Sequence, residues 1–181
     1  MPVDTRLTYD DYCLLPDDGK RYEIIDGELF VTPSPRILHQ IVVSQLLSEL
    51  LTFAKKQGLG RVLAAPVDVV FSEFDVVEPD IVYISKQRAS VMTEKNLQGA
   101  PDLAIEVLSE STEKRDRTTK LKLYGRFGVN EYWIIDPYGP SAEIYRRVEE
   151  GLTLVAKLSA ADSLTSPMLP GFRVSLRELI D

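Results

Sequence analysis

The fold is decided by the stretch Pro101-Asp102-Leu103-Ala104-Ile105-Glu106-Val107-Leu108-Ser109. Its apolar residues predict a β-strand that is buried on both faces. Because successive side chains of a strand point to opposite faces, Glu106 shares its face with Ala104 and Leu108. A carboxylate inside an apolar row is costly unless it is paired, hydrogen-bonded or bound to a metal. Glu106 is therefore a candidate functional residue.

A second acid stands in a similar place upstream. Asp80 leads the apolar run Ile81-Val82-Tyr83-Ile84, directly after Glu78-Pro79. Two acids on neighbouring buried strands predict a site where oxygen ligands hold a metal ion. Cys13 is the only cysteine and His39 the only histidine, which excludes a disulfide within the chain and a zinc site built from cysteines or several histidines. A metal held by oxygens alone points to magnesium or manganese.

Length and composition are those of an ordinary globular protein. The chain has 181 residues, of which 44% are hydrophobic and 27% charged, so we expect one domain spanning residues 1–181. No apolar run approaches the roughly 20 residues of a membrane helix, and the N-terminus lacks the features of a signal peptide. These observations predict a cytoplasmic protein with no membrane contact. A net charge of −7 argues against a protein that coats nucleic acid by bulk attraction.

The order of predicted elements gives the fold class. A short helix at residues 8–12 and a hairpin over 22–31 about Asp26-Gly27 come first. The remaining predictions are a helix from Ile37 to about Gln57, strands at 61–71, 80–84 and 101–108, a helix at about 112–127, a strand at 130–136, a hairpin over 142–155 and a tail that packs back near residue 172. This order predicts an α/β or α+β mixed sheet flanked by helices, with a core of order αβββαβ and added hairpins at both ends.

Lys120 lies on the inward face of the second long helix. At 100° per residue, Tyr124, Leu123 and Phe127 fall within about 100° of it, whereas Lys122 falls on the far side. A lysine in that position must snorkel, pair or serve chemistry. Geometry alone leaves two readings open: an ion pair with Asp116, one turn earlier, and a catalytic role. The two buried acids nearby favour the catalytic role.

Two further observations concern charge and histidine. The residues Lys114, Arg115, Arg117, Lys122 and Arg126 form the densest basic cluster, which is typical of a solvated helix face but also supplies the best candidates for phosphate contacts. His39 begins the apolar stripe of the first long helix, which favours a core histidine over a functional one.

The sequence resembles the Uma-type restriction endonuclease family of the PD-(D/E)XK nuclease superfamily. The resemblance is carried by residues 22–28, His39, Glu78-Pro79-Asp80, residues 106–109, Lys120 with Tyr124, and residues 128–136. It implies a restriction-endonuclease-like fold, with Asp80 and Glu106 as the metal-binding acids. Glu23 matches an acid of the family's first hairpin and could complete the metal shell. The superfamily signature has a lysine two residues after the second acid, where this chain has Leu108; the inward angle of Lys120 favours a lysine that reaches the site from the helix.

The sequence therefore predicts an endonuclease that hydrolyses phosphodiester bonds, with Asp80 and Glu106 holding Mg²⁺ (or Mn²⁺) and Lys120 assisting. Nucleic acid, and DNA in particular, is the expected substrate, and a homodimer is compatible with cutting a duplex. Two alternatives stay open. One is a non-catalytic nuclease-like module that binds nucleic acid or a partner protein; the other treats both acids as structural. Asp68 receives no role.

Overall fold

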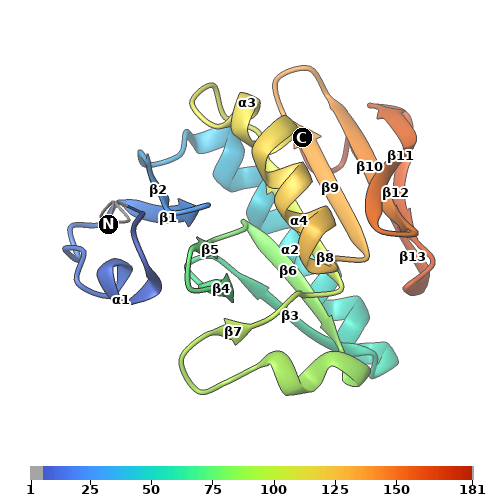
Figure 1. The fold of residues 1–181 in the computed structure, drawn as a ribbon. Coiled ribbons are helices and arrows are strands. Elements are labelled where there is room, and N and C mark those ends of the chain that lie inside the picture. Colours follow the sequence, from blue (N-terminus) through green and yellow to red (C-terminus); the bar gives the residue numbers. More distant parts are fainter. Residues whose placement is uncertain (1–5, 181) are drawn as a thin grey trace.

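The computed structural model describes residues 6–180 and has a mixed α/β fold built on a six-stranded central sheet (Figure 1). The strand order is β11-β10-β9-β8-β6-β3, and neighbours are antiparallel except for the parallel pair β8–β9. The strands are β3 (Gly60–Ala64), β6 (Ile81–Ser85), β8 (Leu103–Val107), β9 (Glu131–Asp136), β10 (Ser141–Val148) and β11 (Gly151–Ser159). The αβββαβ core, from α2 (Ile37–Gln57) to β9, and the fold class are confirmed.

A second sheet closes one end of the molecule. Its order is β2-β1-β5-β4-β7, and the predicted hairpin about Asp26-Gly27 forms its edge. Both turn residues have positive φ, 52° and 79°, as a two-residue hairpin turn requires. The strands are β1 (Arg21–Ile25), β2 (Glu28–Thr32), β4 (Val69–Ser72), β5 (Asp75–Val77) and β7 (Leu97–Gln98). The short helix α1 (Tyr9–Tyr12) precedes this sheet, with Thr8 as its N-cap.

Layers of apolar side chains cover both faces of the central sheet. On one face, Leu46 and Leu50 of α2 pack with Ile81 and Ile105, and the terminal hairpin β12 (Ser163–Ser166) and β13 (Leu169–Ser175) joins this cluster. On the other face lies α4 (Leu121–Phe127). Figure 1 shows α4 in front of the sheet and α2 behind it. The strand β8 is buried on both faces, as predicted, with its alternate residues in the two clusters.

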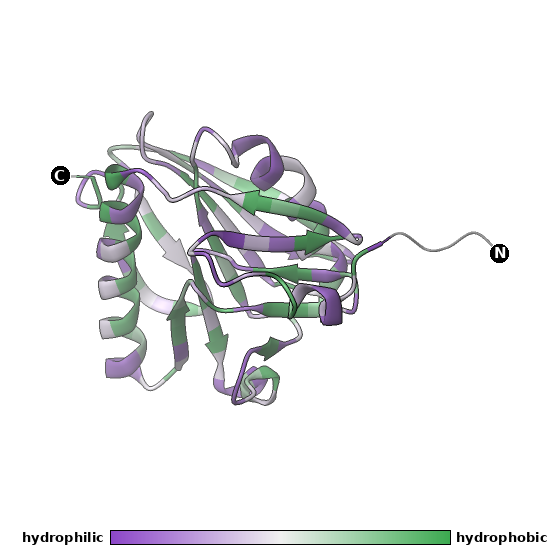
Figure 2. Ribbon diagram, turned by 90° about the vertical axis from the view of Figure 1, so that its left-hand side faces the viewer, coloured by the Kyte–Doolittle hydropathy of each residue, from purple (hydrophilic) through white to green (hydrophobic). Residues whose placement is uncertain are grey.

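Helix α2 begins and ends where the sequence predicts, at Ile37 and before Gly58, which caps the helix in the left-handed conformation. The expectation that no segment is long and apolar enough to cross a membrane is wrong for this helix by length and composition. One side of α2 is nevertheless buried in the core, and Figure 2 shows hydrophilic residues among its hydrophobic ones. Since a core helix of a globular fold passes the same test, the absence of a membrane contact stays a prediction.

Two element predictions need correction, and other elements have no counterpart among the predictions. The strand expected over 61–71 is two strands in different sheets, because Pro66 cannot donate to a ladder and the chain leaves the central sheet there. The helix expected over 112–127 consists of α3 (Glu113–Arg115), the π-helical turn η2 (Asp116–Lys120) and α4. The region 85–100 holds the 3₁₀ helix η1 (Lys86–Val91) and the unpredicted strand β7. The tail forms the unpredicted hairpin β12–β13, in which Phe172 is buried as expected.

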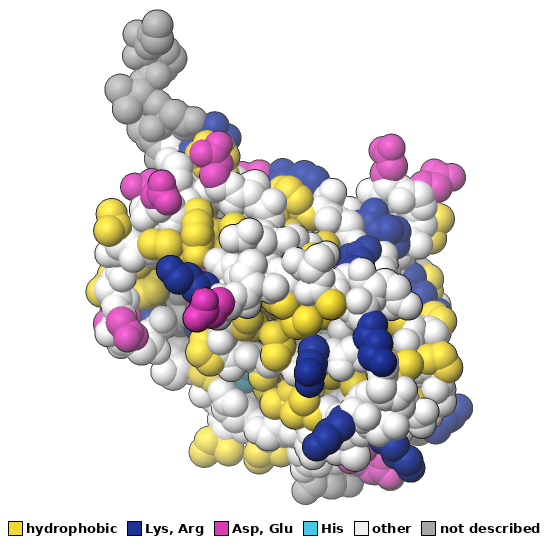
Figure 3. All heavy atoms as spheres, turned by 90° about the horizontal axis from the view of Figure 1, so that it is seen from below, with side chains coloured by type: hydrophobic (Ala, Val, Ile, Leu, Met, Phe, Trp, Pro, Cys, Tyr) yellow, Lys and Arg dark blue, Asp and Glu magenta, His cyan; other side chains and the backbone are white. Residues whose placement is uncertain are grey.

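The underside of the molecule has a mixed surface. Figure 3 shows Lys and Arg side chains gathered over apolar surface on this face. A groove of about 880 Å³ runs there between α2 and the free edge of β3, and its lining includes Leu51, Arg61, Lys86 and Met92. This groove is separate from the candidate site, because Asp80, Glu106 and Lys120 are not among its lining residues.

Candidate active site

Strand register places the two predicted acids side by side. Strands β6 and β8 pair antiparallel with Ile81 opposite Ile105. Asp80 directly precedes Ile81, and Glu106 directly follows Ile105. Continued by one residue, the antiparallel register therefore places Asp80 opposite Glu106. Residues directly opposite in an antiparallel pair point to the same face, with Cβ atoms about 4.5–5.5 Å apart. Both side chains are buried, yet both line one cavity of about 260 Å³. The spatial convergence expected from sequence is present, whereas the chemical roles remain predictions.

Asp80 is held by three donors. Its Oδ1 accepts a hydrogen bond from Arg21 Nη1 at 2.8 Å, and its Oδ2 contacts His39 Nε2 at 3.1 Å and the Val107 amide at 2.9 Å. Burial alone would raise the pKa of Asp80, but the hydrogen bond and charge of His39, the charge of Arg21 and the Val107 amide outweigh it and lower this pKa to about 2. His39, favoured as a core histidine, is buried and also lines the cavity.

Glu106 has one occupied and one open oxygen. Its Oε1 accepts hydrogen bonds from Lys120 Nζ and from the Tyr124 hydroxyl, each at 2.8 Å. Among residues 6–180, no side chain or amide donates to Oε2. Burial raises the pKa of Glu106 to about 8; the charge of Lys120 opposes this rise, and the nearby acids Asp116, Asp80 and Glu23 add to it. The paired acids thus differ sharply: Asp80 is ionised, and Glu106 holds a proton readily.

Lys120 reaches Glu106 from the helix, as its predicted inward angle requires. Its Nζ lies 2.7 Å from Glu23 Oε1, 2.8 Å from Glu106 Oε1 and 3.8 Å from Asp116 Oδ1. Burial would lower the pKa of Lys120, but the charges of these three acids raise it above its usual range, so the ammonium stays charged. Leu108, which stands where the superfamily signature has a lysine, is buried in the apolar cluster under α4. The predicted pair with Asp116 also exists, and it is the longest of the three contacts.

The π-helical turn helps to aim this helix at the cavity. A π turn is wider than an α turn and is often found at functional sites. Asp116 and Lys120, at the two ends of η2, are both buried, whereas Lys122 two residues later is exposed. Gly128 ends α4 in the left-handed conformation, and β9 follows immediately.

Glu23 anchors the basic groups of the cavity. Its Oε1 accepts a hydrogen bond from the Glu78 amide at 2.9 Å besides its contact with Lys120, and its Oε2 lies 3.2 Å from Arg115 Nη2. Arg115 also donates to Thr32 Oγ1 at 2.7 Å. Since Glu23 faces Lys120 and Arg115, its geometry favours the role of a counter-ion over the expected role in a metal shell.

The other candidate phosphate contacts lie away from the cavity. Arg117 pairs with Glu113 and Glu143, Lys114 is exposed, and Lys122 lies beside Asp26 and Arg126 on a separate hollow. Of the basic cluster, Arg115 alone lines the cavity. Asp68, expected on a buried strand, lies in the loop before β4 and accepts a hydrogen bond from Tyr12.

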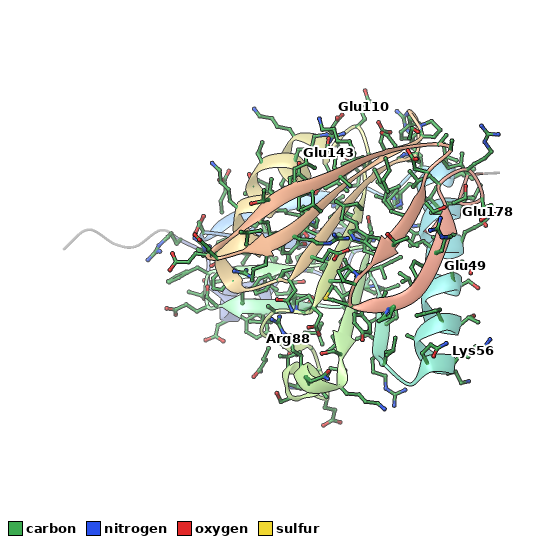
Figure 4. All side chains as sticks on the ribbon, turned by 90° about the vertical axis from the view of Figure 1, so that its right-hand side faces the viewer. Glu49, Lys56, Arg88, Glu110, Glu143 and Glu178 are labelled. Atoms are coloured by element: carbon green, nitrogen blue, oxygen red, sulfur yellow. The ribbon has the colours of Figure 1, made fainter. Side chains whose placement is uncertain are left out.

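An exposed ion pair spans the rim of the cavity. Arg36, the N-cap residue of α2, contacts Glu110 of the β8–α3 loop at 2.7 Å. Figure 4 shows Glu110 projecting from the outer surface, on the side of the molecule opposite to Arg88. The hydroxyls of Ser109, Ser111 and Thr112 hydrogen-bond to one another beside this rim. The cavity thus opens between the start of α2 and the loop that follows β8.

The donor set suits a hard divalent ion that keeps other oxygen ligands. Across residues 6–180, no three or more His, Cys, Asp and Glu side chains form a metal-binding group. Mg²⁺, however, is usually bound by only one or two carboxylates together with water and substrate phosphate. Asp80 is ionised and Glu106 Oε2 is free of hydrogen bonds in the cavity, so these two residues fit such an ion.

Comparisons with known proteins agree with this architecture. The model of the Uma2 family, described as “Putative restriction endonuclease”, matches residues 9–177. The chain belongs to the Uma2 family. A solved structure described as a putative nuclease belonging to DUF820 from Anabaena variabilis ATCC 29413 has the same fold, with a TM-score of 0.80 and 21% identity over 96% of this chain and 97% of that one. No curated protein matches the chain.

In this Uma2 chain, sequence reasoning missed Arg21, which contacts Asp80 and lines the cavity. The available signal was its spacing: Arg21 precedes Glu23 by two residues on β1, so both side chains share one face of the strand. Tyr124, which the sequence places on the inward face of the helix beside Lys120, donates a hydrogen bond to Glu106 Oε1. Family membership supports a nuclease.

Proposed function

We propose that this Uma2 protein is a metal-dependent endonuclease that hydrolyses phosphodiester bonds of DNA. The observation that carries the proposal is the placement of Asp80, directly before β6, and Glu106 of β8 in one cavity with Lys120. When bound, a divalent ion such as Mg²⁺ or Mn²⁺ supplies charge neutralisation at a phosphate and activates water for attack. Family membership supports the reaction class.

The side chains of this chain have distinct tasks in the proposed reaction. Asp80 and Glu106 supply the carboxylate oxygens that would hold the ion. Tyr124 and Lys120 fix Glu106 through Oε1, which leaves Oε2 for ligation. The permanently charged Lys120 stabilises the negative charge that develops on the phosphate. Arg115, whose Nε–H is buried and has no hydrogen-bond partner among residues 6–180, lines the cavity and is the best-placed basic residue for a phosphate oxygen.

A calorimetric titration of Mn²⁺ and Mg²⁺ tests the metal site directly. We expect binding to the wild-type chain and a loss of at least about tenfold in affinity for both Asp80→Asn and Glu106→Gln, since each replaces a carboxyl group that would hold the ion by a neutral amide. Glu131→Gln is the matched control, because Glu131 is equally buried but bonds Trp133 and Arg146 away from the cavity. Absence of binding to a folded wild-type protein would refute the proposal.

Cleavage is the second step. Supercoiled plasmid DNA, single-stranded DNA and RNA are incubated with Mn²⁺ and the wild-type chain or Asp80→Asn, and we expect Asp80-dependent cutting of DNA. Because enzymes that cut both strands of a duplex are commonly symmetric dimers, we extend the proposal to a homodimer, which light scattering checks.

One observation favours the non-catalytic alternative. Both oxygens of Asp80 already accept bonds from Arg21, His39 and the Val107 amide, so the acid is satisfied without a metal. A module of this kind would bind nucleic acid while binding no divalent ion in the titration above.

A further inference from the structure

The contacts of Asp80 restrict where an ion can bind. A carboxylate oxygen has two lone pairs. Oδ2 uses both, one for His39 Nε2 at 3.1 Å and one for the Val107 amide at 2.9 Å. Oδ1 accepts a single bond, from Arg21 Nη1 at 2.8 Å. An ion that binds Asp80 must therefore use Oδ1, directly beside a guanidinium of the same sign of charge.

Arg21 has a second acid within reach. Its Nε lies 3.9 Å from Glu78 Oε2, a distance too long for a hydrogen bond. That oxygen is buried and has no hydrogen-bond partner among the described residues. Glu78 is itself held in place, because Tyr12 donates to its Oε1 at 3.1 Å and its amide donates to Glu23. A buried carboxylate oxygen without a hydrogen bond destabilises the fold, so a hydrogen bond donated to Glu78 Oε2 would be favourable.

The side chain of Arg21 can make this exchange. It is 27% exposed, in contrast to the 2% of Asp80, and it borders the cavity. A guanidinium offers five N–H donors in a planar fork. A shift of about 1 Å would bring Nε into hydrogen-bonding distance of Glu78. The charge of Arg21 would then stay paired after it leaves Asp80.

We propose that Arg21 is a displaceable counter-ion of the metal site: it occupies Asp80 Oδ1 when no ion is bound and transfers to Glu78 when a divalent ion takes that oxygen. This inference rests on the proposed function, since it assumes that Asp80 holds the ion. It makes Arg21 a positioning residue that keeps a buried acid ionised and correctly oriented before the ion arrives.

The test measures Mn²⁺ affinity by calorimetry for the wild-type chain and Arg21→Gln. Removing the competing charge-assisted bond is expected to tighten Mn²⁺ binding by about tenfold or more. The direction of the change is diagnostic, because a variant with a damaged site would bind the ion more weakly. Arg36→Gln is the matched control: it removes the same charge from the same cavity, but from beside Glu110 at the rim. Its affinity is expected to change by less than about threefold.

A second variant gives the opposite sign. Glu78→Gln removes the charge that receives Arg21, so Mn²⁺ binding should weaken. In the double variant Arg21→Gln/Glu78→Gln the weakening should disappear, because no arginine remains to be relocated. Asp68→Asn controls for the loss of a nearby negative charge, since Asp68 contacts the same Tyr12 hydroxyl as Glu78.

The outcomes separate this inference from the proposed function. Binding to the wild type with equal affinity for Arg21→Gln overturns the inference and leaves the metal site standing. Binding to the wild type, with about tenfold or more tighter binding to Arg21→Gln, supports the inference. Absence of binding to both folded proteins overturns the inference and the proposed metal site together.

Discussion

At the scale of single residues, the ammonium of Lys120 faces three buried acids. It is buried among Glu23, Glu106 and Asp116, with Nζ–O distances of 2.7, 2.8 and 3.8 Å. Its pKa is raised in the fold, so its stabilising contribution is fully present below the ordinary lysine range and is lost only as pH rises through the raised value. Under neutral conditions this lysine therefore contributes to stability in full.

Replacing Lys120 with methionine should destabilise the protein by about 3–5 kcal/mol at neutral pH, because it leaves buried acids without their counter-charge. Urea denaturation measures the change. Lys122→Met is the control on the same helix; its side chain is exposed, and we expect a change within about 0.5 kcal/mol. Equal effects of the two substitutions would contradict this account of Lys120.

The ionised form of Asp116 should destabilise the fold, whereas the ionised form of Lys120 stabilises it. Burial, the largest influence, raises the pKa of Asp116, and neither of its carboxylate oxygens has a hydrogen-bond partner within the described part of the chain. Because the pKa is raised in the fold, the carboxyl group loses its proton at a lower pH in the unfolded chain than in the folded one. The folded state therefore loses stability as pH rises above the ordinary carboxyl pKa.

Asp116→Asn should therefore gain stability relative to the wild type as pH rises from about 4, where model carboxyls titrate, to neutrality. Urea denaturation at pH 4 and pH 7 measures the difference. A variant that loses more stability at pH 7 than at pH 4 would contradict this account and show that the ionised acid is needed by Lys120.

At the scale of elements, the helix before β9 depends on its π turn. The buried residues Leu123 and Tyr124 fix α4, whereas Arg115 directly precedes η2. Each residue of an α-helix turns the chain by about 100°. Deleting Thr118, an exposed residue of η2, should convert the π turn into an α turn and rotate Arg115 away from Glu23.

We expect the Thr118 deletion to retain the fold and Lys120–Glu106 contact but to weaken DNA binding at the cavity. Circular dichroism checks the fold, and fluorescence anisotropy with a duplex checks binding. Thr118→Ala, which keeps the chain length, is the control. Wild-type DNA binding by the deletion variant would argue against a role for Arg115.

Elements with strong local signals were predictable from the sequence. Helix α2 was placed to the residue by its apolar stripe and Gly58, and the first hairpin by Asp26-Gly27. The switch of sheets after β3 was missed although Pro66 signals it, because local alternation continues on either side. The π turn was not visible in the spacing of the apolar residues, since one extra residue shifts the helical pattern by a single position. Likewise, the acids and Lys120 followed from burial and register, whereas the contact of Arg21 with Asp80 depends on how the two sheets meet.

The whole molecule is acidic, and this constrains how DNA can bind. A net charge of −7 repels the phosphate backbone, and the basic residues that line the groove beside β3, such as Arg61 and Lys86, do not line the cavity. A divalent ion held by Asp80 and Glu106 would reverse the local charge where the substrate must approach.

DNA binding should therefore depend on a divalent ion. With Ca²⁺, another hard cation that takes oxygen ligands, we expect a 20-base-pair duplex to bind at least about tenfold more tightly than in EDTA, as one phosphate contact of modest strength requires. Asp80→Asn should show no such gain. Equal affinity of the wild type in Ca²⁺ and in EDTA would contradict the placement of the ion.

The residues of the cavity are widely spaced along the chain, from Arg21 to Lys120, and β8 is complete as a central strand only when β9 pairs with it. Protein synthesis delivers the chain from its N-terminus. Asp80 and Glu106 therefore leave the ribosome before the lysine that neutralises them and before the strand that supports them. Under the proposed activity, a nascent chain is inert toward the DNA of the cell that makes it, and cutting begins only after folding.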